Sequence, residues 1–196
     1  MPPDATETRR RILEAGHREF AEFGLAGARV DRIAEKADAN KRSIYVHYGT
    51  KEELFDIVLA RNLQSMIETA PLDPLDLPGS AARLYDMLCE RPDVLRLTQW
   101  ALLERPQPIA EELVAYRERI NQLRAAQQEG QVNAELDAPT LFAMTIALAS
   151  SWGNAPWALR AAAAAPPNPA TAPHRLRRSV AKAVAALADP PRGRAQ

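Results

Sequence analysis

Side chains able to read a nucleic acid gather in one short stretch of this chain, between positions 41 and 51. They are Lys41, Arg42, Ser43, Tyr45, His47 and Lys51. Lysine and arginine donate to guanine O6 and N7, serine bonds to either kind of base, and tyrosine and histidine reach phosphate oxygens. These residue types indicate contacts with DNA, although an ordinary solvated helix could carry the same residues.

The flanking segments predict a helix-turn-helix that presents this stretch. An apolar stripe favours a helix over 30–37, Asp38-Ala39 turns the chain, and Asn40 caps a helix over 41–48. On the second of these helices Ile44 and Tyr48 lie four residues apart, so both can face inward and leave the polar side chains outside.

Helices are also expected on either side of this unit. The first runs from about Thr6, its proposed N-cap, to Phe23 and ends at Gly24. The fourth starts after Thr50 with a capping box of the form Thr-x-x-Glu and continues to 67. Lys51 then lies in a first turn whose free N–H groups would hold a phosphate. The basic run 9–11 is either an arm that reaches the DNA backbone or a solvated helix start.

Charge alone does not separate these alternatives. The formal net charge of the 196 residues is zero, whereas nucleic-acid binders are usually basic. Between positions 29 and 51, however, the cations outnumber the anions. Any DNA contact must therefore come from a local patch.

The remaining chain predicts more helices and no strand, hence an all-α fold. Expected helices cover 80–90, 93–104, 108–129, 138–153 and 174–188, with a connector at 71–79, a low-complexity loop at 161–173 and a frayed end at 190–196. The single Cys89 forms no intrachain disulfide. There is no apolar run long enough to cross a membrane and no signal peptide, which favours the cytoplasm.

No catalytic motif, metal-ligand spacing or phosphate-binding loop occurs, so neither an enzyme nor a metal or other cofactor is expected. Trp100 and Tyr116 combine a large apolar surface with a polar tip, and are the candidate ligand-binding residues for an apolar or aromatic small molecule. Plain core packing is the alternative for both.

The last two expected helices have the spacing of a helical dimer surface. Their apolar positions are Leu141, Leu148, Trp152, Leu176, Val180, Val184 and Leu187, and the small residues Ala143, Ala147, Ser150 and Ser151 would allow close approach. A homodimer is expected, with packing inside one chain as the alternative.

The stretch from about 6 to 66 resembles the DNA-binding domain of tetracycline-repressor (TetR) family regulators. The likeness rests on the Ile33-Ala34 pair, the Ile44-Tyr45 pair and the Thr50-Lys51-Glu52 helix start. It implies an all-helical dimeric repressor with a DNA-binding domain at 6–66 and a larger ligand-binding and dimerisation domain at 80–188. It also implies that Tyr45, His47 and Lys51 lie at the DNA.

Four residues depart from the family pattern. Asp38 replaces the usual turn glycine, although aspartate tolerates the left-handed conformation better than most residues. Arg29 stands where a threonine commonly caps the second helix, and it can still hold a phosphate. Asp31 replaces a frequent base-contacting arginine, and Arg42 replaces a small residue. These changes affect the operator sequence rather than the fold.

The leading hypothesis is a repressor that a small-molecule ligand releases from a palindromic operator of double-stranded DNA. A transcriptional activator or a constitutive DNA-binding protein of the same fold is the alternative. A helical ligand-binding or catalytic protein without a DNA function is the third reading.

Overall fold

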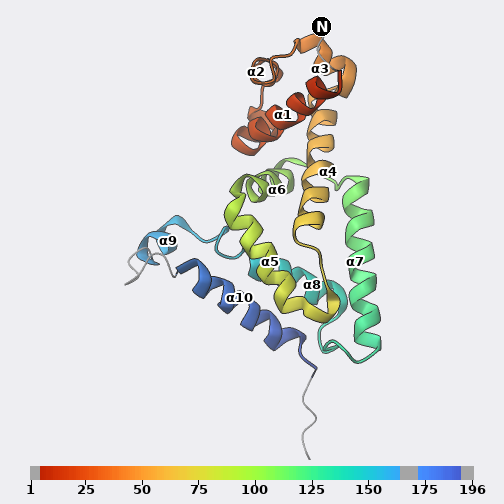
Figure 1. Ribbon diagram of the computed structural model, residues 1–196, viewed down its shortest axis with the longest axis vertical. Helices are drawn as coiled ribbons and strands as arrows, with labels where there is room; N and C mark the ends of the chain where they lie inside the picture. The colour runs from red at the N-terminus through yellow and green to blue at the C-terminus, as the bar shows by residue number, and fades with distance from the viewer. Residues whose placement is uncertain (1–4, 164–171, 191–196) are drawn as a thin grey trace, which may run out of the picture. The chain divides into compact units, whose positions relative to one another are not determined.

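The computed structural model describes residues 5–163 and 172–190, which form α-helices, one 3-10 helix and no strand (Figure 1). The all-α prediction is confirmed for these residues. The chain divides into two compact units. The first contains 1–65 and 91–113, and the second contains 66–90 and 114–196.

The first unit holds the predicted helix-turn-helix. Its helices are α1 (Ala5–Gly27), α2 (Val30–Lys36), α3 (Lys41–Tyr48), the first part of α4 (Lys51–Thr69) and α6 (Pro92–Glu104). The buried core joins all five: Ile12, Phe20, Ile33, Ile44, Leu54, Phe55 and Leu97 are at most 1% exposed. The Phe20 and Phe55 rings pack edge to face, with their centroids 4.9 Å apart.

Gly24 interrupts α1 where the sequence predicts its end. Its φ of 68° and ψ of −175° are non-helical, and a single turn follows before Gly27. A Cβ on Gly24 would lie 2.8 Å from Trp100 and from the Glu104 carboxylate. Glu104 accepts the backbone N–H groups of Leu25 and Ala26, so the end of α6 holds this turn in place.

The second unit is a helical bundle formed by η1 (Pro74–Asp76), α5 (Leu77–Glu90), most of α7 (Ala110–Gln128), α8 (Ala138–Ser150), α9 (Trp157–Ala163) and α10 (Ala172–Ala188). Helix α5 lies beside α10 and α8 (Figure 1). Leu77, Ala81, Leu123, Leu141 and Val184 are at most 1% exposed and form the centre of its core.

Three sequence expectations need correction in this unit. Helix α5 begins at Leu77 inside the expected connector, because a proline such as Pro78 is tolerated in a first helical turn. Helix α9 was not expected, and it overlaps the start of the expected loop at 161–173. The rest of that loop from 164 to 171, and the chain end from 191, lie outside the described residues.

The third correction concerns the expected dimer surface. Leu141, Val180 and Val184 are at most 6% exposed within the single chain. Leu148, Trp152, Leu176 and Leu187 pack partly buried against the same core. Periodicity identified the apolar stripes correctly. Helices of the same chain cover Leu141, Val180 and Val184, while a dimer surface that includes Leu148, Trp152, Leu176 and Leu187 stays a prediction.

The expected domain bounds of 6–66 and 80–188 stay predictions. Packing places residues 91–113 with the N-terminal unit, because Leu97 and Ile109 belong to the core that contains α1 and α4.

Candidate nucleic-acid interface

Helix α3 has the bounds that the sequence predicts and is fixed at both ends. The Asn40 side chain accepts the backbone N–H of Arg42 at 2.8 Å, which caps the helix, and Gly49 ends it with a φ of 72°. Ile44 is 1% exposed, and the half-buried Tyr48 donates its hydroxyl to the Arg9 carbonyl at 3.0 Å. Both inward-facing predictions are confirmed, so the inner face of α3 is anchored.

The turn before α3 depends on Asp38. Its φ of 48° is left-handed, as expected for the residue that stands in place of a turn glycine. Arg11 holds its carboxylate at 3.3 Å, and the Asp38 N–H donates to the Glu35 carbonyl at 3.1 Å. A non-glycine residue therefore maintains the angle between α2 and α3.

The outer face of α3 carries most of the predicted site. Lys41, Arg42, Tyr45 and His47 are exposed, Tyr45 to 47%, and Ser43 is half-buried. Sequence reasoning missed Val46, whose side chain is 70% exposed. The signal was present, because an apolar residue between Tyr45 and His47 falls on the side opposite Ile44.

Lys41 is paired with an acid from the neighbouring helix. Its Nζ lies 2.8 Å from Oδ1 of Asp31, the residue that departs from the family pattern. The hydrogen bond that the Lys41 ammonium donates to Asp31 raises the pKa of Lys41. Part of the positive charge predicted for this face is therefore balanced locally.

Arg29 and Lys51 both lie at the start of α2. Arg29 is exposed and makes no side-chain cap, as expected from the missing threonine. The Lys51 ammonium donates to the Ala28 carbonyl at 3.3 Å. Lys51 therefore lies at the same end of α2 as Arg29, because Ala28 directly precedes Arg29 in the chain.

A buried carboxylate holds the N-cap residue of α2. Glu19 of α1 has no exposed surface, and it accepts from the Arg29 N–H at 3.0 Å, from Arg32 at 2.6 Å and from Lys36 at 3.3 Å. Burial by itself would raise the pKa of Glu19, but these donors outweigh it and hold the pKa below its ordinary value. Sequence reasoning missed Glu19 because its partners are ten or more residues away.

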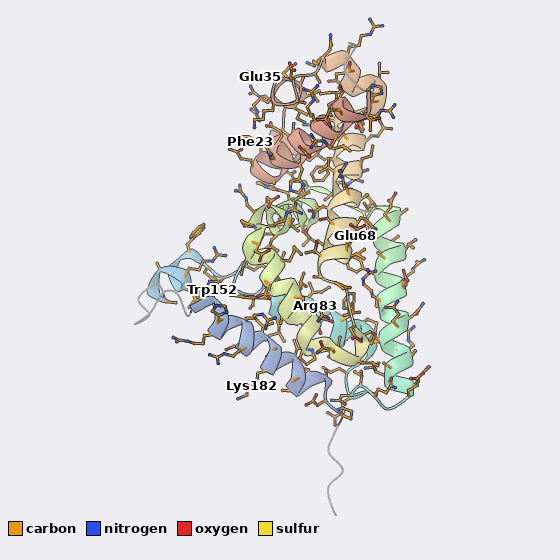
Figure 2. The ribbon with its side chains drawn as sticks, viewed as in Figure 1. Phe23, Glu35, Glu68, Arg83, Trp152 and Lys182 are labelled. Atoms are coloured by element: carbon orange, nitrogen blue, oxygen red, sulfur yellow. The ribbon has the colours of Figure 1, made fainter. Side chains whose placement is uncertain are left out.

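Phe23 continues the same contact between α1 and α2. The Arg32 guanidinium lies 4.3 Å from the centroid of the Phe23 ring, which is labelled in Figure 2. Arg32 is therefore used to join two helices rather than offered to a ligand.

The predicted capping box at the start of α4 is confirmed. The Glu53 N–H donates to Thr50 Oγ1 at 3.1 Å, and the Thr50 N–H donates to Glu53 Oε2 at 2.7 Å. The second of these bonds is the main reason why the pKa of Glu53 is lowered. The box fixes the helix start at which Lys51 lies.

The basic run at 9–11 lies within α1 rather than in a flexible arm. Arg10 is engaged by Glu7 and Glu14, and Arg11 by Asp38. The Arg9 side chain is exposed, while its carbonyl accepts from Tyr48.

The two predicted ligand-binding residues fall in different units. Trp100 belongs to the first and covers Gly24, whereas Tyr116 belongs to the second, where its ring lies 6.1 Å from that of Phe142. Each of these residues packs against neighbours of its own unit, and their role in ligand binding stays a prediction.

Two features are absent from the described residues. No cluster of three or more histidine, cysteine, aspartate or glutamate side chains is placed to hold a metal. No helix there combines the length and apolar character needed to cross a bilayer.

A capped, outward-facing α3 supported by α2 and α1 defines a helix-turn-helix protein with an added helical unit. Comparison with known proteins agrees. Residues 12–58 match the model for bacterial regulatory proteins of the tetR family, and residues 76–185 match the tetracyclin repressor-like C-terminal domain.

Named relatives and solved structures extend this match. The HTH-type transcriptional repressor SCO4008 of Streptomyces coelicolor is 38% identical over 152 residues, covering 75% of this chain and 79% of that protein. The regulator TtgR of Pseudomonas putida is 29% identical over 177 residues, covering 76% and 81%. The crystal structure of regulator SCO4942 from Streptomyces coelicolor superimposes with a TM-score of 0.81 at 35% identity, covering 94% and 99%.

The chain belongs to the TetR family of transcriptional regulators. Members of this family act by binding DNA and are not enzymes, as the sequence predicts.

Proposed function

We propose that this chain is a repressor that binds a palindromic operator as a homodimer and leaves it when a small molecule binds. The observation that carries the proposal is the outer face of α3, whose exposed cationic and aromatic side chains stand on an inner face anchored by Ile44 and Tyr48. Two such helices, one from each protomer, would enter successive major grooves.

The proposed contacts divide by chemistry. Arg42, Lys41 and Ser43 read base edges, with Lys41 shared between the DNA and Asp31. Tyr45 and His47 bond to phosphate oxygens, and Arg29 and Lys51 hold a phosphate at the start of α2 and α4. Val46 adds an apolar contact with a thymine methyl group.

The dimer surface is proposed on the exposed side of α8. Ala143, Met144, Ala147 and Ser151 are exposed there, Met144 to 40%, and they form a narrow strip of small or flexible side chains. Such a strip allows two helices to approach closely. The apolar stripe of α8 that contains Leu141 stays within the chain.

Release by a ligand is supported by the match of residues 76–185 to the family's C-terminal domain. Tyr116 and Phe142 offer an aromatic pair in that region, which favours an apolar or aromatic effector. Such a ligand weakens DNA binding only to the extent that it binds the released state more tightly. The proposed location is the cytoplasm, where operator DNA is accessible.

A mobility-shift titration with the DNA upstream of the chain's own gene tests the proposal. We expect a saturable shift that Tyr45→Ala and Lys51→Ala both weaken. The Lys51→Ala variant should also lower the salt slope by about one unit. Lys182→Ala on α10, labelled in Figure 2, removes the same charge from an exposed site of the other unit. Equal affinities for all four proteins would refute the assignment of α3.

The alternative function is an activator of the same fold. The name of SCO4008 favours repression. A reporter fused to the shifted promoter decides, because deletion of a repressor gene raises expression and deletion of an activator gene lowers it.

A further inference from the structure

A cavity of about 410 Å³ lies entirely within the first unit, between α1, α4 and the start of α6. Its size falls in the range of small-molecule sites, which is roughly 300 to 1,000 Å³. None of the DNA-contacting residues proposed above lines it, and neither does Trp100 or Tyr116.

The walls of this cavity are rich in cations. Arg18 lies on α1, Arg61 lies on α4, and Arg91 directly precedes α6. Within the described residues, Arg18 and Arg61 make no hydrogen bond or ion pair. Two exposed guanidinium groups therefore face one cavity, and neither forms an ion pair with a described carboxylate.

The acidic residues of the cavity are already engaged. Asp93 lies 2.5 Å from His17 Nε2 and 3.5 Å from Arg91, which also donates to Ser65 at 3.1 Å. The other acid, Glu14, shares Arg10 with Glu7. Arg18 and Arg61 are thus the lining cations that form no ion pair within the described residues.

The floor of the cavity is apolar. Val58 is 1% exposed, and the half-buried Leu13 lies beside it in the lining. A ligand that fills this site would place its carboxylates next to the arginine guanidinium groups. Its apolar part would pack on Val58 and Leu13. Arginine matches carboxylate geometry through two parallel hydrogen bonds.

We propose that this cavity binds a small organic acid, such as an aromatic compound with one or two carboxylates. The assignment goes beyond the effector site proposed for the C-terminal region and does not depend on DNA binding. It gives the protein a second ligand, of anionic rather than neutral apolar chemistry.

Isothermal titration calorimetry of the full chain tests the site at constant ionic strength in a buffer free of phosphate. The probes are phthalate, its neutral analogue phthalamide and inorganic phosphate. We expect phthalate to saturate one site per chain with a Kd of about 1 mM or tighter. Phthalamide should not bind, and phosphate should bind more weakly than phthalate.

The variant that tests the assignment is Arg18→Gln with Arg61→Gln, because neither side chain bonds within the described protein and its loss leaves no internal partner stranded. We expect the Kd for phthalate to rise at least about tenfold. Arg117→Gln, an exposed arginine of α7, is the matched control and should bind as the original chain does. Circular dichroism checks that the variants are folded.

Three results would overturn the proposal. Phthalate that fails to saturate the original chain removes the site. An unchanged Kd in the double variant removes the two arginines from it. If phosphate binds as tightly as phthalate, the apolar floor makes no contribution to binding. That result would exclude the assignment of an organic acid as the ligand.

Discussion

Asp31 on α2 and Lys41 on α3 form an ion pair of 2.8 Å across the helix-turn-helix. Asp31 therefore ties the start of α3 to α2, and it also neutralises a cation on the surface proposed for DNA. Both side chains are largely exposed, so the ion pair contributes little to the stability of the fold. Its main effect is expected on the affinity for DNA.

The first prediction follows from this pair. Asp31→Asn frees Lys41 and should tighten binding to DNA of any sequence, with the salt slope steeper by about one unit. Fluorescence anisotropy at several salt concentrations measures both effects. Glu35→Gln removes the same charge from an exposed position of α2 where no pairing with Lys41 occurs. A gain no larger than that of Glu35→Gln would mean that Lys41 does not contact DNA.

Local rules were sufficient to predict α3 and its support. The bounds of α3, the left-handed Asp38, the inward Ile44 and the Thr50–Glu53 capping box all depend on residues within a few positions of one another. Caps, turns and short apolar stripes are set by this local chemistry, so one sequence is enough to read them.

Contacts between distant residues were not predicted. Glu19 looks like a solvated helix position until Arg29, Arg32 and Lys36 fold over it. The stripe that contains Val184 could equally well face a partner chain or its own. Periodicity shows that a helix face is buried, but it does not show which element covers it.

The second prediction uses the buried carboxylate. Glu19→Gln loses the charge that Arg32 and Lys36 share, and should lower the free energy of unfolding by about 1–3 kcal/mol at neutral pH. Urea denaturation measures the change. Glu22→Gln on the same helix is the control, because its side chain is exposed. Equal losses in both variants would show that burial of Glu19 has no special role.

The pH dependence of the same variant gives a third prediction. The pKa of Glu19 is lower in the folded chain than its ordinary value, so its stabilisation is complete above an unfolded pKa of about 4.3. It is lost as the pH falls through the folded pKa. The stability difference between the original chain and Glu19→Gln should therefore shrink below that pH. A difference that stays constant over this range would contradict the lowered pKa.

The fourth prediction concerns Gly24. Alanine there must adopt a φ of 68°, which costs about 1–3 kcal/mol, and its Cβ would press on Trp100 at 2.8 Å, which adds about 1–3 kcal/mol. Gly130→Ala is the control, since its φ is 71° but no atom lies within 4 Å of the added Cβ. Thermal denaturation should show the larger loss for Gly24→Ala. Similar losses at both glycines would mean that Trp100 moves aside without cost.

The last prediction concerns Val46, which is 70% exposed and so contributes little to the fold. Its substitution by alanine should change the free energy of unfolding by less than about 0.5 kcal/mol. An apolar side chain on a helix in the major groove meets the thymine methyl group, which uracil lacks. Replacing thymine by uracil at one operator position per half-site should therefore weaken binding to the original chain by about 1 kcal/mol, and weaken binding to Val46→Ala less. Thymines at other positions are the internal control. If the original chain binds thymine and uracil operators equally at every position, Val46 does not read a methyl group, and the specificity of this helix rests on its polar side chains alone.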